Sequence, residues 1–251
     1  MLKQIEDIHN INSYSYDYPE ELVAHKPKEK REQANLLVKN IDDTYEQHKF
    51  YELSSLLPKG SLLIFNNSKV FNSRVYGKKS SGAKLEVFLL KAPNGTTFAT
   101  CTALVKPMKK IKLNTTIVFT DKIKAEVTKI HDSKNIKTVE LKFNITRESL
   151  NIWLKQNAST PLPPYIKTTL ETDEIKTKYQ TIYAKNTGSV AAPTAGLHFS
   201  ESIFTQIKKS QISIAYINLH IGLGTFLPVR EIDIKKHNMH KETFSVPKET
   251  L

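Results

Sequence analysis

The chain has 251 residues, of which 39% are hydrophobic and 25% charged, and its formal net charge is +12. These proportions exclude an intrinsically disordered chain, and the length suffices for one large domain or two modest ones. The excess of Lys and Arg makes a nucleic acid the first partner to consider, because positive charge attracts a phosphate backbone over long distances. A solvated basic face without a partner is the simpler alternative.

The cysteine content and the N-terminal residues predict a reducing compartment. Cys101 is the single cysteine, which excludes an internal disulfide and a thiolate metal cluster built within this chain. Residues 1–12 carry charged groups where a signal peptide is apolar, and no apolar run approaches the roughly 20 residues that cross a bilayer. We therefore expect a cytoplasmic protein with no membrane association.

The first part of the chain predicts short elements of mixed type. A helix is expected to begin at Pro19, because two glutamates follow it and the helix dipole favours carboxylates in the first turn. Strands are expected at 34–38 and 61–66, with a turn at 42–43 and one helical turn at 53–57 between them.

Short β-rich segments spaced by turns follow between residues 70 and 143, a spacing typical of a small barrel. Asn94 and Gly95 predict a two-residue type I′ hairpin turn, in which both central residues have positive φ. The segment is also dense in lysine. Its predicted strands lie at 84–90, 97–105, 116–119, 123–130 and 137–143.

The segment GSVAAPTAGLHF at 188–199 is the first candidate site, after a predicted helix at 149–157 and a proline-stiffened loop at 161–166. Its small residues let the backbone approach a ligand, and His198 near its end is a potential acid–base group. Ser200 is expected to cap a following helix, with Phe199 packing on Phe204. A loop that enters a helix N-terminus suits a phosphate, a carboxylate or developing negative charge. The alternative is a tight connection in which the glycines serve packing.

A second candidate site follows the buried strand expected at 212–219, because ligands favour the carboxyl ends of such strands. There Gly222 and Gly224 permit positive φ or close backbone approach, although the third glycine of a dinucleotide-binding loop is missing. His237, His240 and Glu242 suggest a metal site, but the histidines are three apart rather than four. Substrate contact or a local hydrogen-bond network is therefore favoured, and no metal is expected.

Together these segments resemble, in order and spacing, the S-adenosylmethionine:tRNA ribosyltransferase-isomerases of queuosine biosynthesis. The resemblance spans almost the whole chain. It rests on YDYPEEL at 16–22, LLIFN at 62–66, PLPPYI at 161–166, YQTIYA at 179–184, VAAPTAGLHF at 190–199, HIGLGTFLPV at 220–229 and HNMH at 237–240.

The resemblance implies an enzyme that uses S-adenosylmethionine as a ribosyl donor. Such an enzyme moves the ribosyl moiety onto 7-aminomethyl-7-deazaguanine in the tRNA wobble position, gives epoxyqueuosine, and releases adenine and methionine. The expected partners are the anticodon stem-loop of tRNA and S-adenosylmethionine, and a monomer is expected. The implied fold is a mixed α/β main domain from residues 1–68 and 150–251, with an inserted small antiparallel β-barrel at 69–149.

The implied site combines the two candidate segments in one pocket. His198, His220 and Thr194 are the expected catalytic residues, since histidine titrates near neutrality and can transfer protons. A buried structural hydrogen bond is the alternative for each histidine. The expected substrate-binding residues are Arg74, Tyr165, Pro193, Ala195, Gly196, Gly222, Gly224, Thr225, His237 and His240.

Some positions depart from the family pattern. Asn66, Asn67, Ser68 and Lys69 stand where the family has Asn-Asp-Thr-Arg, while Asn35 replaces an arginine and His25 a glutamine. These changes remove a carboxylate and two guanidinium groups, which affects binding and turnover.

Family members also continue beyond the position of Leu251, so we expect a truncated chain with an unpaired sheet edge. Two other functions stay open. One is a remnant that binds tRNA through the lysine-rich barrel without catalysis, and the other is a methyltransferase, which the lack of a glycine-rich loop near the N-terminus disfavours.

Overall fold

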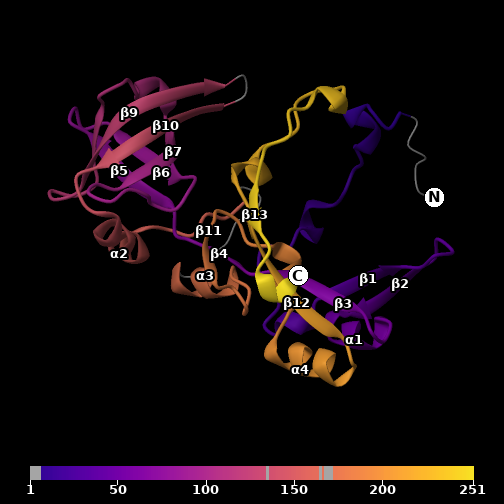
Figure 1. Cartoon of the computed structure of the whole chain (residues 1–251). Helices are drawn as coiled ribbons and strands as arrows, with labels where there is room; N and C mark the ends of the chain where they lie inside the picture. Colours follow the sequence, from indigo (N-terminus) through magenta and orange to yellow (C-terminus); the bar gives the residue numbers. More distant parts are fainter. Residues whose placement is uncertain (1–6, 134–135, 164–165, 167–171) are drawn as a thin grey trace.

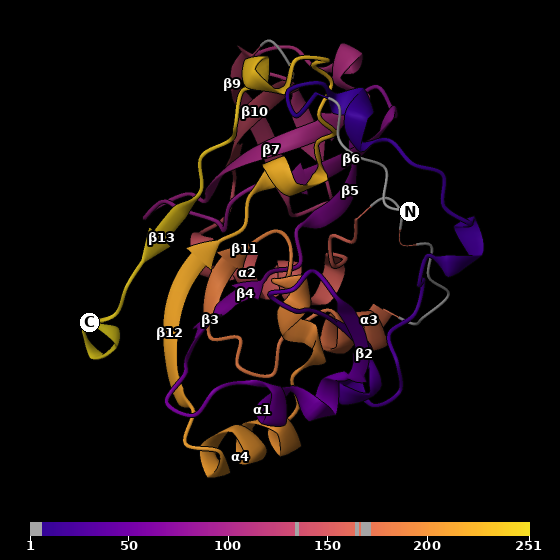
Figure 2. The same ribbon diagram turned by 90° about the vertical axis from the view of Figure 1, so that its right-hand side faces the viewer.

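The computed structural model describes residues 7–133, 136–163, 166 and 172–251. It contains a closed barrel from the middle of the chain and smaller sheets with helices, to which both ends of the chain contribute (Figures 1 and 2). The expected fold class, mixed α/β with a small antiparallel β-barrel, is confirmed. No helix within the described ranges is long and apolar enough to cross a membrane.

Six antiparallel strands form the barrel in the order β10-β7-β6-β5-β8-β9. Alternate residues of each strand point inward, as in β7, where Cys101, Ala103 and Val105 are buried. Closure removes the exposed edges of the sheet. The strands are β5 (Arg74–Lys79), β6 (Lys84–Leu89), β7 (Thr100–Lys106), β8 (Thr116–Val118), β9 (Lys124–Ser133) and β10 (Ile136–Phe143).

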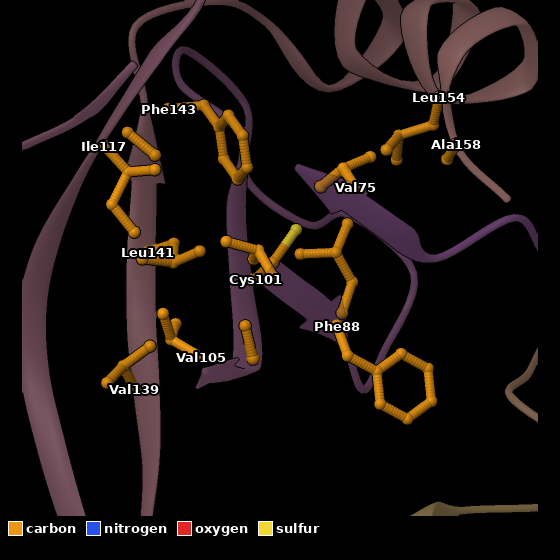
Figure 3. Close-up of a cluster of buried hydrophobic side chains, with 14 of the residues drawn as sticks. Val75, Phe88, Cys101, Val105, Ile117, Val139, Leu141, Phe143, Leu154 and Ala158 are labelled. Carbon is orange, nitrogen blue, oxygen red and sulfur yellow. The ribbon is translucent and has the colours of Figure 1, made fainter. Parts of the chain in front are cut away.

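The barrel core is apolar and fully enclosed (Figure 3). Ile117, Leu141 and Phe143 are at most 1% exposed, and the helix α2 (Arg147–Asn157) adds Leu150 and Leu154 to the same cluster. The predicted domain boundaries at 68/69 and 149/150 stay a prediction, and α2 crosses the second of them.

Cys101 lies inside this core (Figure 3). Burial raises the pKa of its thiol to about 12, because the thiolate would lose its hydration. The thiol is therefore neutral at physiological pH and contributes apolar packing rather than reactivity.

The turn predicted at Asn94 and Gly95 is wrong in its type. Asn94 pairs with Thr100 through two backbone hydrogen bonds of 3.0 and 2.8 Å, so the loop is longer than two residues. Gly95 alone of the predicted pair has positive φ, at 99°. The sequence signal located a turn between β6 and β7, but the pairing of the flanking residues determined its length.

A three-stranded sheet in the order β13-β12-β3 forms the centre of the second part. One face of this sheet packs Phe65 and Tyr216 against α4 (Glu201–Lys209), whose Ile203 and Ile207 are fully buried. The strands are β3 (Leu62–Asn66) and β12 (Ser213–His220), which are parallel, and β13 (Thr243–Ser245), which is antiparallel to β12.

The opposite face of this sheet is open to solvent. Leu62 and Ile64 of β3 are 55% and 58% exposed, and Phe244 of β13 is 69% exposed. These residues point away from α4, because side chains alternate between the two faces of a strand.

The remaining elements are short. The hairpin of β1 (Asn35–Lys39) and β2 (Tyr45–Lys49) precedes α1 (Leu53–Leu56), and β4 (Ser68–Val70) pairs in parallel with β11 (Asn186–Ser189). The helix α3 is Thr172–Lys178. The helix expected at Pro19 is a single 3-10 turn, Glu20–Leu22.

The N-terminal arm meets a segment close to the C-terminus, where the indigo and yellow ribbons come together in Figure 1. Ile11 N donates to Ile232 O at 2.9 Å, and Ile234 N donates to His9 O at 2.8 Å. Segments more than 220 residues apart in the chain are thereby held side by side.

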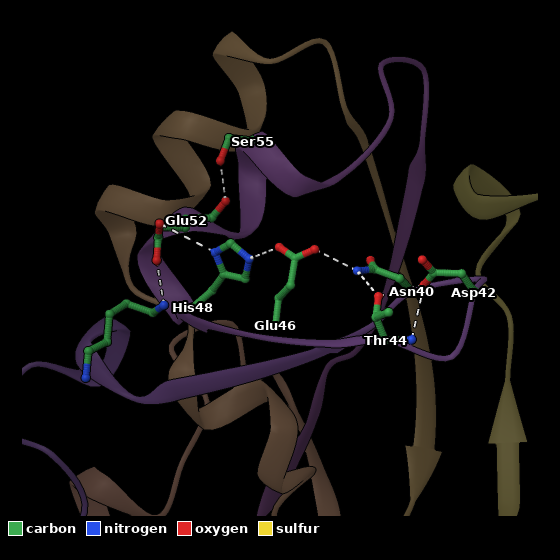
Figure 4. Close-up of polar contacts among 8 residues, drawn as sticks. Asn40, Asp42, Thr44, Glu46, His48, Glu52 and Ser55 are labelled. Carbon is green, nitrogen blue, oxygen red and sulfur yellow. Dashed lines mark hydrogen bonds and ion pairs between the residues drawn. The ribbon is translucent and has the colours of Figure 1, made fainter.

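A polar cluster fixes the β1–β2 hairpin to the turn that follows it (Figure 4). His48 lies between two carboxylates, with Nε2 at 3.2 Å from Glu46 Oε2 and Nδ1 at 3.6 Å from Glu52 Oε1. Asn40 donates to the other oxygen of Glu46 at 2.6 Å, and Lys49 N donates to Glu52 at 2.6 Å. The pKa of His48 is raised, first by the hydrogen bond to Glu46 and then by Glu52.

Because the pKa of folded His48 lies above its unfolded value, the imidazolium stabilises the hairpin below about pH 6.5. This contribution is lost as the pH rises through the folded pKa. We expect Glu46→Gln to lower the pKa of His48 more than Glu52→Gln does, since Glu46 makes the stronger contact. NMR titration of the His48 ring measures both shifts, and equal or absent shifts would contradict the geometry.

Candidate functional site

The start of the small-residue segment, 188–199, is hydrogen-bonded to the start of the glycine loop, residues 221–226. Ser189 Oγ, fully buried, donates to Ser68 Oγ at 2.8 Å and accepts a hydrogen bond from Ile221 N at 2.9 Å. Val190 N donates to Ile221 O at 3.0 Å. These bonds position the chain as it leaves β12, which places the glycine loop beside β11.

Asn66 extends the pairing of β3 with β12 by means of its side chain. Its Nδ2 donates to Leu219 O at 2.9 Å, and its Oδ1 accepts from Leu219 N at 3.0 Å. The next residue, Asn67, accepts from Asn186 Nδ2 at 3.1 Å through its own Oδ1. The resemblance leads us to expect an aspartate in place of Asn67, and the Asn67 amide oxygen supplies an acceptor at this buried position.

His220 at the end of β12 packs its ring directly on Gly188. A Cβ added to Gly188 would lie 2.2 Å from Cε1 and 2.3 Å from Nδ1 of the ring, so only glycine leaves room for it. The Asn218 amide nitrogen lies 3.3 Å from Nε2. Since an amide N–H can only donate, Nε2 accepts, and the proton of the neutral ring is on Nδ1.

Nδ1 of His220 is buried and has no hydrogen-bond partner among the residues that the structure describes. An unsatisfied buried polar atom costs about 1–3 kcal/mol, so it requires an explanation. The alternative interpretation of His220, a buried structural hydrogen bond, has no support at this nitrogen. Asn218 Oδ1 beside it is unsatisfied in the same way.

The glycine loop holds a histidine–glutamate pair. Glu242 Oε1 accepts from Gly222 N at 2.8 Å and lies 3.3 Å from His240 Nε2. A Cβ on Gly224 would lie 1.9 Å from His240 Nδ1, so the ring occupies the space that this glycine leaves. Glu242 therefore fixes both the loop and the orientation of His240.

Glu242 was not among the expected catalytic or substrate-binding residues, although it contacts two of them, Gly222 and His240. The sequence suggested a metal site or a local hydrogen-bond network for it, whereas its contact with a backbone amide 20 residues earlier depends on the pairing of β12 with β13. No group of three or more potential metal ligands occurs within the described ranges.

Beyond the glycines, the loop reaches the barrel. Its 3-10 turn, Leu223–Phe226, includes Thr225, and Phe226 lies 5.9 Å from the Phe88 ring of β6. Arg74 lies 5.7 Å from the same ring and 3.6 Å from Glu86. Arg74 and the loop thus share Phe88 as a neighbour.

The rest of the small-residue segment packs elsewhere. Its 3-10 turn, Thr194–His198, lies against Tyr183, whose hydroxyl would be 2.1 Å from a Cβ on Gly196. The His198 ring lies 5.3 Å from the Phe50 ring, with the two planes tilted by 47°. Arg31 secures this turn by donating to Leu197 O at 3.3 Å and to Gln180 O at 2.7 Å.

Burial lowers the pKa of His198, and the nearby Arg31 charge lowers it further, against a hydrogen bond to the Arg31 backbone. The ring is therefore neutral at pH 7. The neutral ring can accept a proton, but burial and the Arg31 charge make it a weaker base than an exposed imidazole.

The structure places His240 against Gly224 in the loop that follows His220, whereas the 3-10 turn Thr194–His198 packs on Phe50 and Tyr183. Convergence of both groups in one pocket stays a prediction. Pro193 accepts from Gly196 N at 2.8 Å and Ala195 is exposed, while His237 follows the 3-10 turn Ile234–Lys236. Tyr165 lies outside the described residues.

The helix start beside this cluster is confirmed in part. Ser200 is the N-cap of α4, but its hydroxyl makes no capping bond and lies 2.8 Å from Ser202 Oγ. Phe199 and Phe204 pack 5.7 Å apart, as expected.

Comparisons with known proteins agree on one family. A family model described as queuosine biosynthesis protein matches residues 11–251. A Thermosipho melanesiensis protein named S-adenosylmethionine:tRNA ribosyltransferase-isomerase is 40% identical over 242 residues, which are 96% of this chain and 68% of that protein. A Sulfurihydrogenibium protein of the same name is 39% identical over 245 residues, which are 96% of this chain and 69% of that protein.

A crystal structure of S-adenosylmethionine tRNA ribosyltransferase from Thermotoga maritima aligns with 25% identity and a TM-score of 0.35. The alignment covers 94% of this chain and 62% of that chain. The chain thus spans about two thirds of the length of these relatives.

Proposed function

This chain belongs to the queuosine biosynthesis protein family of S-adenosylmethionine:tRNA ribosyltransferase-isomerases, and we propose that it catalyses that reaction itself. In the proposed reaction, S-adenosylmethionine is the ribosyl donor and 7-aminomethyl-7-deazaguanine in the tRNA wobble position is the acceptor. The products are epoxyqueuosine in tRNA, adenine and methionine. The observation that carries the proposal is the match of about 40% identity across 96% of the chain.

The reaction breaks the glycosidic bond to adenine and the carbon–sulfur bond to methionine. It therefore requires a proton donor for the departing adenine and a base for the acidic proton beside the sulfonium. Protein groups suffice for both steps, since S-adenosylmethionine brings the leaving groups with it.

The pair of His240 and Glu242 supports the base role. Glu242 is held by the amide of Gly222 and orients the imidazole, which is the arrangement that general bases use. His220 supports the donor role, because its unpaired Nδ1 leaves it free to contact the departing adenine and to donate a proton when the ring is protonated. Gly224 leaves room for the His240 ring and Gly188 for the His220 ring, and Arg74 supplies a cation at the barrel side of the loop.

The proposal is tested by following adenine release from S-adenosylmethionine in the presence of tRNA that carries the 7-deazaguanine base. We expect adenine and methionine to appear in equal amounts and only with the modified tRNA. Formation of S-adenosylhomocysteine would indicate a methyltransferase instead. Salt-sensitive tRNA binding without any adenine would indicate the binding-only alternative.

A further inference from the structure

The positive charge of the molecule is concentrated in the barrel segment. Residues 69–149 contain 17 Lys and Arg against 6 Asp and Glu, a net charge of +11. The other 170 residues contain 20 Lys and Arg against 19 Asp and Glu. Nearly the entire excess therefore lies in one third of the chain, which is the electrostatic pattern of a surface that binds a polyanion.

On the side of the barrel formed by β9 and β10, which we call the compensated side, lysines lie opposite or beside carboxylates. Lys137 makes an ion pair of 2.5 Å with Asp132, and Lys129 lies directly opposite Glu140 in the pairing of β9 with β10. Lys142 lies opposite Glu126 and 5.0 Å over the Phe98 ring. Charges that are paired within the protein attract phosphate less strongly.

On β5, β6 and the strands beside them, the pairing is different. Lys78 and Lys84 lie directly opposite each other, and both are exposed. Val118 of β8 lies opposite Lys78 of β5 on one side and opposite Lys124 of β9 on the other. Three lysines therefore point outward from one row that crosses four adjacent strands. Like charges directly opposite each other destabilise a sheet, so this arrangement costs stability without an intramolecular gain.

The same surface is hollowed and carries an aromatic ring. A cavity of about 740 Å³ lies over β5, β6 and β8 and is lined by Lys78, Lys84 and Tyr76, with Tyr76 64% exposed. Two carboxylates also line it. Of these, Glu86 forms an ion pair with Arg74, and Asp121 belongs to the segment 118–121 that lines the cavity. Lysines beside an exposed aromatic ring are the combination that binds a phosphate backbone and stacks an unpaired base.

We propose that this face, defined by Tyr76, Lys78, Lys84 and Lys124, docks the RNA substrate. The inference rests on the proposed function, which requires an anticodon stem-loop to reach the site. Lys78, Lys84 and Lys124 contact phosphates of the RNA, and Tyr76 stacks on a base of its single-stranded loop. The glycine loop reaches the barrel through Phe226 and Phe88, which joins the docking face to the candidate site along β6.

The test compares two double variants of the full chain that remove the same charge. Lys78→Ala/Lys84→Ala is expected to weaken binding of an unmodified anticodon stem-loop RNA about tenfold at 0.1 M salt. It should also reduce the salt slope of log K by about 1.5, since each lost phosphate contact removes roughly 0.7–0.9. The control, Lys129→Ala/Lys137→Ala, is expected to change affinity less than about threefold. Fluorescence anisotropy over a salt series measures both.

The variant Tyr76→Ala tests base stacking separately from the phosphate contacts of the lysines. It should weaken binding about tenfold while leaving the salt slope unchanged, because stacking releases no counterions. Equal losses in the two double variants, an unchanged slope in Lys78→Ala/Lys84→Ala, or no RNA binding by the unaltered chain would overturn the proposal. Because this assay contains no S-adenosylmethionine, intact RNA docking without adenine release would refute only the proposed catalysis.

Discussion

His220→Ala is expected to lower the rate of adenine release about 100- to 10,000-fold, the range that a general acid or base contributes. The free energy of unfolding should change by about 1 kcal/mol or less, because Nδ1 of His220 makes no hydrogen bond whose loss would matter. Single-turnover release of adenine measures the first quantity. Urea unfolding followed by circular dichroism measures the second.

His131→Ala is the matched control for this variant. His131 is an exposed histidine of β9, paired with Glu140 at 3.0 Å on the compensated side of the barrel, so its removal should leave the adenine rate unchanged. A His220→Ala variant with full activity would remove His220 from the mechanism. A variant that loses activity only because it unfolds would assign His220 a structural role.

Gly188→Ala is expected to lower the free energy of unfolding by about 1–3 kcal/mol, the usual cost of forcing extra atoms into a packed site. The added methyl group would overlap the His220 ring at 2.2 Å, and either the ring or β11 must move. Adenine release should fall as well, because the displaced ring no longer occupies its position at the end of β12.

The His220→Ala background tests the cause of this cost. Without the ring, the methyl group has space, so Gly188→Ala should then cost less than about 0.5 kcal/mol. Urea unfolding of the two single variants and the double variant gives the coupling energy. Additive effects would show that Gly188 is required for some other reason than the ring of His220.

The barrel could be predicted from the sequence because its strands alternate apolar and polar residues between turns. β11 and β13 could not, since they have four and three residues and no alternating pattern. β2 consists of Tyr, Glu, Gln, His and Lys, which lack the usual signature of a strand, and pairing with β1 determines its conformation.

The sequence predicted close approach of another group at the glycines of the candidate site, but it did not identify the side chain that approaches each glycine. Gly188 and Gly224 each admit a histidine ring, whereas Gly196 admits the hydroxyl of Tyr183. The same sequence signal therefore has different structural causes. Only tertiary contacts distinguish them, so the sequence could suggest a local network of His240 and Glu242 but not its contact with the loop.

The solvent-exposed apolar face of the β13-β12-β3 sheet makes dye fluorescence an ambiguous probe of folding in this protein. Leu62, Ile64 and Phe244 offer an apolar surface in the folded state, so hydrophobic dyes such as anilinonaphthalene sulfonate should fluoresce with native protein. A fluorescent signal of that kind would then report this surface rather than loosened packing. Peptide-bond ellipticity, which reads the backbone directly, separates a misfolded variant from an inactive one.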